Sequence, residues 1–383
     1  MKLDYTNSFI LNSLGLPVFK DLDELSFAMG ISKSMLFLLT ENNKEYYKTF
    51  TITKKNGMDR TINSPAYSMK HVQRWILAEI LEKIAVTNES MAFRKGIGNG
   101  SKRNAEHHQY SLYLLQFDLE NFFTSIKKDR VYYIFKNLGY NSFVSNILTN
   151  ICIYEDYLPQ GGVCSPYLSN LICYKLDKRL KGLCSKRDIL YTRYADDLTF
   201  SCDNKLTLKK IKQVIEEIIE DEGFKVNVKK TRLLSPSSHK KITGLTVNNG
   251  DVKASKKLKR KVRSMIHHAV VTADYSKSNQ IKGYVSYINS IEAGYIDSVK
   301  EYIDCMIEKD YNTYGEVVNS FNENKFFKDL NNMTFDDRYD TQEYDEEYEE
   351  YGESYIPDPR REFLKDKGYI KIDPTNIDDV FGF

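Results

Sequence analysis

The chain has 383 residues, 41% of them hydrophobic and 28% charged, and a formal net charge of +2. A chain of this length and composition is typical of a globular protein with a large core in more than one lobe. No apolar run approaches the length of a membrane span, and the six cysteines form no C-x-x-C pair, so we expect a cytoplasmic protein without a membrane partner, disulfides or zinc.

The N-terminal segment combines helical and strand patterns. Residues 1–45 predict helices, and residues 46–65 predict a β-hairpin with a turn at Asn56-Gly57. Basic residues flank this turn: Lys54, Lys55 and Arg60. Residues 67–86 then have apolar side chains at helical spacing.

The central segment predicts a sheet covered by helices. An apolar strand at residues 113–118 ends in Asp118, and a helical pattern follows at 129–140. A glycine turn then precedes a helix with an apolar stripe from Leu168 to Leu180. A hairpin at 190–202, a further helix and a short strand within 223–230 complete the segment. This order of elements favours an α+β fold in which helices pack on one face of a mixed sheet.

Two adjacent aspartates, Asp196 and Asp197, occupy the turn of the hairpin LYTRYADDLTFSC. Neighbouring carboxylates repel unless a cation or hydrogen bonds compensate, although an isolated pair is also a common polar turn. In the predicted layer, Asp118 can meet Asp196 at one sheet edge, which supplies the oxygen ligands that Mg²⁺ requires. Two such ions can activate a hydroxyl and stabilise a leaving pyrophosphate, which is the chemistry of nucleotide polymerisation.

Several motifs, in the same order, resemble those of reverse transcriptases. They are Tyr194-Ala195-Asp196-Asp197, the F-D-x-x-x-F-F segment Phe117–Phe123, Gln160-Gly161 followed by Ser165-Pro166, and the downstream GFKVNVKKT. Two more resemble motifs of the bacterial retron type: NAEHH at Asn104–His108, and ITGLTV at Ile242–Val247, where Ile stands in place of the usual Val.

The resemblance spans residues 50–265 and implies a right-hand polymerase. The N-terminal helices and the fingers would occupy residues 1–110, and the palm with its catalytic carboxylates 111–245. A helical thumb would follow at 246–320, and an acidic C-terminal extension at 321–383.

The resemblance also implies a catalytic role for each matching residue. Asp118 and Asp196 would bind two Mg²⁺ ions, or Mn²⁺ as the alternative, with Asp197 as the second carboxylate of the hairpin. Phe123 matches the family's steric gate, whose ring excludes a ribose 2′-hydroxyl, with a core position as the alternative. Lys230 is the candidate acid for pyrophosphate departure, and the adjacent Lys229 is not distinguished from it.

Further residues are expected to contact the nucleotide. Gln160 and Gly161 would cradle the incoming nucleotide and the template base, because glycine allows a close approach of the backbone; a simple turn before a helix is the alternative. Arg60, with Lys54 or Lys55, would neutralise the triphosphate.

Two other groups are candidates for RNA contact. His107 and His108 would point in opposite directions in a strand and have no partner at metal-ligand spacing, so we interpret Asn104 and His108 as a structural or RNA-contacting pair. Seven of the eleven residues at 253–263 are Lys or Arg, which predicts a thumb helix that grips phosphates, or else a solvated face. The expected RNA-binding residues here are Lys256, Lys257, Lys259, Arg260 and Arg263.

The charge is divided unevenly between the body and the tail. Residues 336–383 hold 16 acidic and 6 basic side chains, a net charge of −10, which leaves +12 on residues 1–335. A basic body with an acidic tail is a pattern of nucleic-acid-binding proteins. Ten of the eighteen residues at 336–353 are acidic and none is aliphatic, so we expect disorder by default. The regular tyrosines indicate a segment that docks on a partner or one that mimics nucleic acid, and we favour docking.

The retron resemblance implies partners as well. A cognate structured noncoding RNA would serve as template and as primer through a 2′-hydroxyl, and dNTPs would extend it into RNA-linked single-stranded DNA (msDNA). An effector protein in antiphage defence, host ribonuclease H for template removal and an oligomer within a defence complex are also expected. The alternatives are another bacterial reverse transcriptase, of the abortive-infection or group II intron type, and a non-catalytic RNA-binding scaffold, which the complete set of carboxylates disfavours.

Overall fold

The computed structural model describes residues 4–53, 57, 59–96, 100–248, 250–272 and 276–305. The predictions for Lys54 and Lys55, for the turn residue Asn56 and for the acidic extension therefore lie outside the described residues. Within the described ranges, no helix is both long enough and apolar enough to cross a membrane. All six cysteines are free thiols; Cys305 is exposed and the others are buried.

The N-terminal region is helical, as the sequence predicts. It contains α1 (Ser8–Ser13), α2 (Leu22–Met29) and α3 (Lys33–Glu41), followed by the short η1 (Asn43–Tyr46). Each of the three α-helices begins at a residue whose side-chain oxygen accepts a backbone N–H of the first turn: Asn7, Asp21 and Ser32. Their leucines enter a core that is shared with the central sheet.

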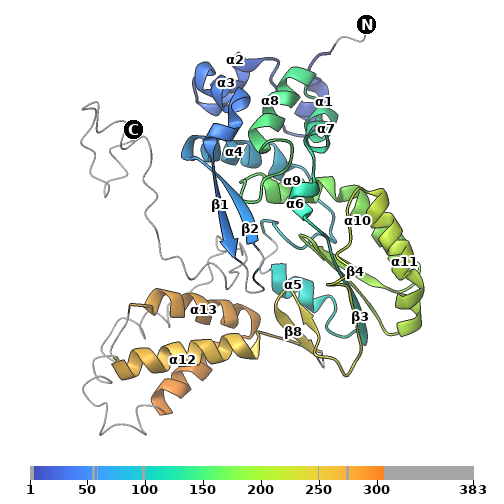
Figure 1. Cartoon of the computed structure of the whole chain (residues 1–383), viewed down its shortest axis with the longest axis vertical. Coiled ribbons are helices and arrows are strands. Elements are labelled where there is room, and N and C mark those ends of the chain that lie inside the picture. Colours follow the sequence, from blue (N-terminus) through green and yellow to red (C-terminus); the bar gives the residue numbers. More distant parts are fainter. Residues whose placement is uncertain are drawn as a thin grey trace.

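The predicted hairpin is also present. Strands β1 (Tyr47–Thr53) and β2 (Asp59–Pro65) pair in antiparallel fashion, and Figure 1 shows them projecting away from the N-terminal helices. The chain then forms α4 (Tyr67–Glu79) and η2 (Leu81–Lys83).

The central sheet has the strand order β4-β5-β3-β6. Its strands are β3 (Tyr113–Asp118), β4 (Leu190–Tyr194), β5 (Asp197–Cys202) and β6 (Arg232–Leu234). All neighbouring strands are antiparallel, so the expectation of a mixed sheet was wrong; among the described residues, parallel pairing is limited to one isolated bridge, between Ser90 and Arg193. The two-residue turn between β4 and β5 requires antiparallel pairing.

Helices cover both faces of this sheet, whereas the sequence predicted helices on one face. On one face Leu115, Phe117 and Phe200 pack under α10 (Tyr174–Ser185) and α11 (Lys205–Asp221). On the other face lies α5 (Gly100–Glu106), which the sequence reading missed.

Between β3 and β4 the chain forms several helices. They are α6 (Phe122–Ser125), α7 (Lys128–Leu138), α8 (Ser142–Cys152) and α9 (Ser165–Ile172), the last of which ends at Cys173 just before α10. The single helix expected from the stripe between Leu168 and Leu180 is therefore two helices. The strand expected within 223–230 is reduced to one bridge between Val226 and Leu119, and β6 forms a few residues later.

The C-terminal part of the described chain has its own core. Strands β7 (Lys241–Ile242), β8 (Leu245–Asn248) and β9 (Asp251–Lys253) form a small sheet, and α12 (Lys256–Thr272) and α13 (Ser278–Ile291) follow. Residues 295–305 are helical as well. Leu114 of β3 and Ala105 of α5 join this second core, which connects the helices to the central sheet.

Candidate active site

The two-residue turn between β4 and β5 presents the adjacent aspartates at the edge of the sheet. Tyr194 and Asp197 are register partners, so Ala195 and Asp196 alone make the turn. Ala195 has φ of 52°, a conformation that costs a non-glycine residue free energy and that persists where the surroundings hold it. Asp196 accepts a hydrogen bond at its carbonyl from Leu119 N, at 3.0 Å, so the turn is tied to the end of β3.

Asp118 lies beside this turn. It ends β3, its register partner on β5 is Asp197, and it is 8% exposed. Its carboxylate accepts hydrogen bonds from Lys230 Nζ at 2.7 Å and from Asn227 Nδ2 at 3.1 Å. Burial by itself lowers the pKa of Lys230, but the hydrogen bond and negative charge of Asp118 outweigh it and raise the pKa. Both Lys229 and Lys230 are exposed, and it is Lys230 whose Nζ contacts the Asp118 carboxylate.

Asp196 is in electrostatic contact with groups from three parts of the chain. Burial and the negative charge of Asp118 raise its pKa, and the positive charges of Lys230 and Arg60 oppose that rise. Arg60 belongs to β2, so the N-terminal hairpin brings a cation to the turn at Ala195-Asp196. A dianionic pair of this kind is what a divalent cation stabilises.

The three aspartates do not form a closed metal site. Within the described ranges, no group of three or more His, Cys, Asp or Glu side chains is arranged to hold a metal ion. Asp118 is the register partner of Asp197, and its negative charge raises the pKa of Asp196, while its own carboxylate pairs with Lys230. The oxygen donors and the repulsion between Asp118 and Asp196 fit a divalent ion, provided that the Lys230 ion pair opens.

The glycine turn at Gln160-Gly161 packs directly against the N-terminal hairpin. Asn63 N on β2 donates to Gln160 O at 2.8 Å. Gly161 has φ of 113°, and a Cβ at this position would lie 3.0 Å from Asn63 O, so glycine is required. A Cβ on Gly162 would lie 2.6 Å from the Ser165 Oγ atom. The glycine turn therefore contacts β2, the strand whose Arg60 acts electrostatically on Asp196.

Comparison with known proteins identifies the family. Residues 52–249 match the family described as Reverse transcriptase (RNA-dependent DNA polymerase). The chain is 37% identical to the retron Ec86 reverse transcriptase of Escherichia coli over 292 residues. This alignment covers 76% of this chain and 90% of that protein. The chain belongs to the retron reverse transcriptases. The retron Mx65 reverse transcriptase of Myxococcus xanthus is 29% identical, over 72% of this chain and 70% of that one.

Membership of this family makes the protein an RNA-directed DNA polymerase with a right-hand fold, and reverse transcriptases use divalent metal ions. Among solved structures, the Candida albicans telomerase in complex with a telomeric RNA fragment aligns with a TM-score of 0.46 and 13% identity, over 75% of this chain and 59% of that chain. Such a distant likeness adds nothing to the family assignment.

The two adjacent phenylalanines of the reverse transcriptase motif have different environments. Phe122 is 4% exposed and packs in the core against Phe224, at a ring-centroid distance of 5.7 Å. Phe123 is half-buried, and its ring lies 6.4 Å from that of Phe93. This division agrees with Phe123, rather than Phe122, as the candidate gate of the reverse transcriptase.

Asn104 and His108 lie inside the palm. His108 is fully buried and bonds Thr192 on β4 and Ser201 on β5, both at 2.7 Å, and Asn104 accepts a hydrogen bond from Thr192 at 2.5 Å. The two histidines follow helix α5 and are not in a strand, so that assumption was wrong. Of the two roles considered for the pair, these contacts favour the structural one.

Burial, with a smaller contribution from the charge of His107, lowers the pKa of His108 from 6.5 to about 3. Between these values the unfolded chain binds the extra proton, so folding stability is lost as the pH falls below 6.5. We expect His108 alone to lower the free energy of unfolding by about 2 kcal/mol when the pH falls from 7 to 5. Urea unfolding should show a shallower pH dependence in His108→Gln, whereas His107→Gln should keep that of the wild type. Equal pH slopes in all three proteins would contradict a neutral, buried His108.

The predicted basic residues of the thumb fall into two groups. Lys256, Lys257 and Arg260 are exposed on α12. Lys259 pairs with Glu292 at 2.5 Å, and Arg263 lies over the Tyr302 ring at 4.8 Å. The first group is available to phosphates, while the second also holds the thumb helices together.

A buried ion pair beneath the catalytic turn was not recognised in the sequence. Arg193 on β4 and Asp177 on α10 are both fully buried and are joined by two hydrogen bonds of 2.8 Å. Arg193 also donates to the carbonyl of Ala195, at 3.2 Å. The signal was present, because Arg193 is a charge in a strand that is otherwise suited to burial.

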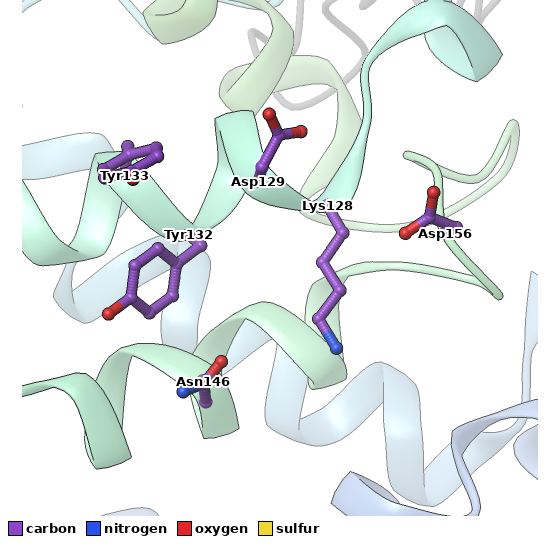
Figure 2. A pocket seen from close by; sticks show the side chains of 6 residues that line it. All are labelled: Lys128, Asp129, Tyr132, Tyr133, Asn146 and Asp156. Carbon is purple, nitrogen blue, oxygen red and sulfur yellow. The ribbon is translucent and has the colours of Figure 1, made fainter.

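A separate pocket of about 460 Å³ lies at α7 and α8. Figure 2 shows its lining side chains, which come from α7, α8 and the loop that follows α8: Lys128, Asp129, Tyr132, Tyr133, Asn146 and Asp156. None of the predicted site residues lines this pocket.

Proposed function

We propose that this retron reverse transcriptase copies part of a cognate structured noncoding RNA into single-stranded DNA that remains linked to the RNA, and that it acts in antiphage defence. The observation that carries the polymerase chemistry is the meeting of Asp118 with Asp196 and Asp197 at one sheet edge. The RNA-linked product and the defence role rest on kinship with retron enzymes.

In this proposal Asp118 and Asp196 hold two Mg²⁺ ions, or Mn²⁺, with Asp197 as the further carboxylate. The bound ions lower the pKa of the attacking hydroxyl and neutralise phosphate charge. Lys230, released from Asp118, donates a proton to the leaving pyrophosphate. Arg60 pairs with the triphosphate, a role that Lys54 shares.

The site also orients the substrate and the template. Gln160 and Gly161 support the nucleotide and the template base from a turn that is bonded to β2. The proposed partners are the noncoding RNA, its DNA product, dNTPs, an effector protein and host ribonuclease H, with assembly into a larger defence complex.

The test is to purify the protein from its natural host and to sequence the nucleic acid that copurifies with it. We expect one structured RNA that is covalently joined to DNA. Deoxyribonuclease should degrade the DNA and leave its junction with the RNA intact. The Asp196→Asn, Asp197→Asn variant should retain the RNA and lack the DNA. Wild-type protein that carries RNA but no DNA in every preparation would overturn the proposal.

Phe123→Ala is expected to admit ribonucleotides, because it removes the ring that would collide with the 2′-hydroxyl. The preference for dNTP over rNTP in kcat/KM should fall by about 10- to 100-fold, with only a modest loss of dNTP use. Single-nucleotide extension with each substrate measures this ratio. An unchanged ratio would make Phe123 a core residue only.

The exposed basic face of α12 should contribute RNA affinity through counterion release. Replacing Lys256, Lys257 and Arg260 together by Ala should weaken binding to all RNA sequences alike and reduce the slope of log K against log salt by about 2 to 3. The matched control replaces three exposed lysines of α11 on the palm, Lys205, Lys209 and Lys210. Equal losses in the two triple variants would indicate bulk charge and not a thumb contact.

A further inference from the structure

Phe93 adopts a backbone conformation that is rare for a large side chain. Its φ is 58°, in the left-handed region that favours glycine. The two residues before it are fixed by hydrogen bonds to the palm: Met91 N donates to Arg193 O at 2.8 Å, and Asn170 Nδ2 donates to Ala92 O at 2.9 Å. A strained residue persists where its surroundings determine its position in this way, and such residues concentrate at functional sites.

The strained backbone places the Phe93 ring between two functional parts of the enzyme. On one side it packs against the buried cluster of Met91, Ala92, Tyr194 and Ala195, which includes half of the catalytic turn. On the other side it meets the Phe123 ring, with the ring planes inclined by 51°. Phe93 thus connects the candidate gate to the catalytic turn.

The half-buried Phe123 ring packs on the edge of the main core. Phe123 belongs to α6, a helix of only four residues that starts after Asn121, itself at φ of 50°. Its aromatic partners are Phe93 and the preceding residue, Phe122, whose ring centroid lies 5.3 Å away. A gate discriminates only if its ring stays in place when a 2′-hydroxyl presses on it, and Phe93 is the contact that ties this ring to Tyr194 and Ala195 of the turn.

We propose that Phe93 is a positioning residue for sugar selection: it braces the Phe123 ring against the catalytic turn and so maintains the exclusion of ribonucleotides. The inference rests on the proposed function, because it requires Phe123 to be the gate. Phe93 itself touches neither the metal ligands nor the reacting atoms, so its loss should affect selectivity more than the rate of dNTP incorporation.

The key variant is Phe93→Gly, because glycine adopts φ of 58° without strain and the substitution removes only the ring. We expect the ratio of kcat/KM for dNTP to that for rNTP to fall about three- to tenfold, which is the range of one aromatic pair. The change should appear mainly as a lower KM for rNTP. The preference for dNTP over dideoxynucleotide should not change, because the 3′-position is not gated.

Four further variants make the test specific. Phe93→Tyr retains the ring and should retain the selectivity, and Phe93→Leu retains apolar volume beside Ala195 but should lose selectivity, so the test stands even if Phe93→Gly folds poorly. Phe143→Ala removes an exposed phenylalanine of α8, away from the site, and should change nothing. In the Phe123→Ala background, Phe93→Gly should have no additional effect, because the two rings act as one unit.

The outcomes separate the two proposals. If Phe123→Ala relaxes selectivity while Phe93→Gly and Phe93→Leu do not, the gate stands and the brace is wrong. Equal relaxation for 2′- and 3′-modified substrates would also overturn it, since that result indicates general loosening of the site. If the wild type shows no DNA synthesis at all, the proposed function itself has failed.

Discussion

Asp196→Asn combined with Asp197→Asn is expected to abolish DNA synthesis while the fold and RNA binding remain. Each asparagine keeps the size of the side chain and removes only the charge that holds a divalent ion. We expect primer extension to fall at least about a thousandfold, equivalent to about 4 kcal/mol in the activation barrier. Single-nucleotide extension on an RNA template, at saturating dNTP, measures the loss.

The stability of this variant provides an internal check. Burial and the charge of Asp118 both raise the pKa of Asp196, so its ionised form is disfavoured in the folded protein. Neutralising it should leave the unfolding free energy equal to that of the wild type or higher, and a loss of activity then cannot be attributed to unfolding.

The matched control is Asp188→Asn, which removes one charge from an exposed turn of the same palm, at φ of 53°, where asparagine is well tolerated. It should extend primers at the wild-type rate. Wild-type extension by the double variant would exclude the turn aspartates from catalysis.

Local patterns were sufficient to locate the catalytic turn. The apolar run that ends in Asp118 and the hairpin around Asp196 follow from period-two alternation and turn chemistry, and both elements are confirmed. Adjacent acidic residues in a tight turn are unfavourable by themselves, which pointed to compensation from elsewhere in the chain. The family motifs then assigned roles that pattern alone left open.

What the sequence missed depends on tertiary contacts. The register that pairs Asp118 with Asp197, and the antiparallel direction of β3 and β5, involve strands about 80 residues apart in the chain, so no turn chemistry specifies them. Helix α5 is short, and the polar side chain of Asn104 suggests a surface position. Its hydrogen bond from Thr192, 88 residues away in the chain, is a tertiary contact. The positive φ of Phe93 has no local signal, because only its hydrogen-bonded neighbours impose it.

The buried pair of Arg193 and Asp177 shows the same dependence on tertiary structure, and it should have the largest effect on stability. Although burial alone lowers the pKa of Arg193, the charge of Asp177 keeps it raised, so the guanidinium is ionised inside the palm. Asp177 also accepts hydrogen bonds from Tyr191 at 2.8 Å and from Thr87 at 2.6 Å. These contacts join α10, β4 and the segment before Phe93 under the catalytic turn.

Arg193→Met is expected to destabilise the protein by about 3 to 5 kcal/mol, because it leaves the Asp177 carboxylate buried without a cation. That loss is a large part of the 5 to 15 kcal/mol typical of folded domains. Urea unfolding at pH 7 measures it, and Lys33→Met, which breaks the exposed ion pair with Asp23, should cost less than about 1 kcal/mol.

Adding Asp177→Asn to Arg193→Met should recover part of the stability, because the uncompensated charge is then gone. The amide can still accept a hydrogen bond from one of the Tyr191 and Thr87 hydroxyls and donate one to the other. The loss of unfolding free energy in the double variant should be smaller than the sum of the two single losses, by about 1 to 3 kcal/mol. Activity should not recover with it, because Ala195 O has lost the donor that Arg193 supplied to the catalytic turn.

Two single losses that simply add would mean that the ion pair does not couple α10 to β4. Full recovery of extension in the refolded double variant would mean that the turn keeps its geometry without Arg193, and that the pair serves stability alone.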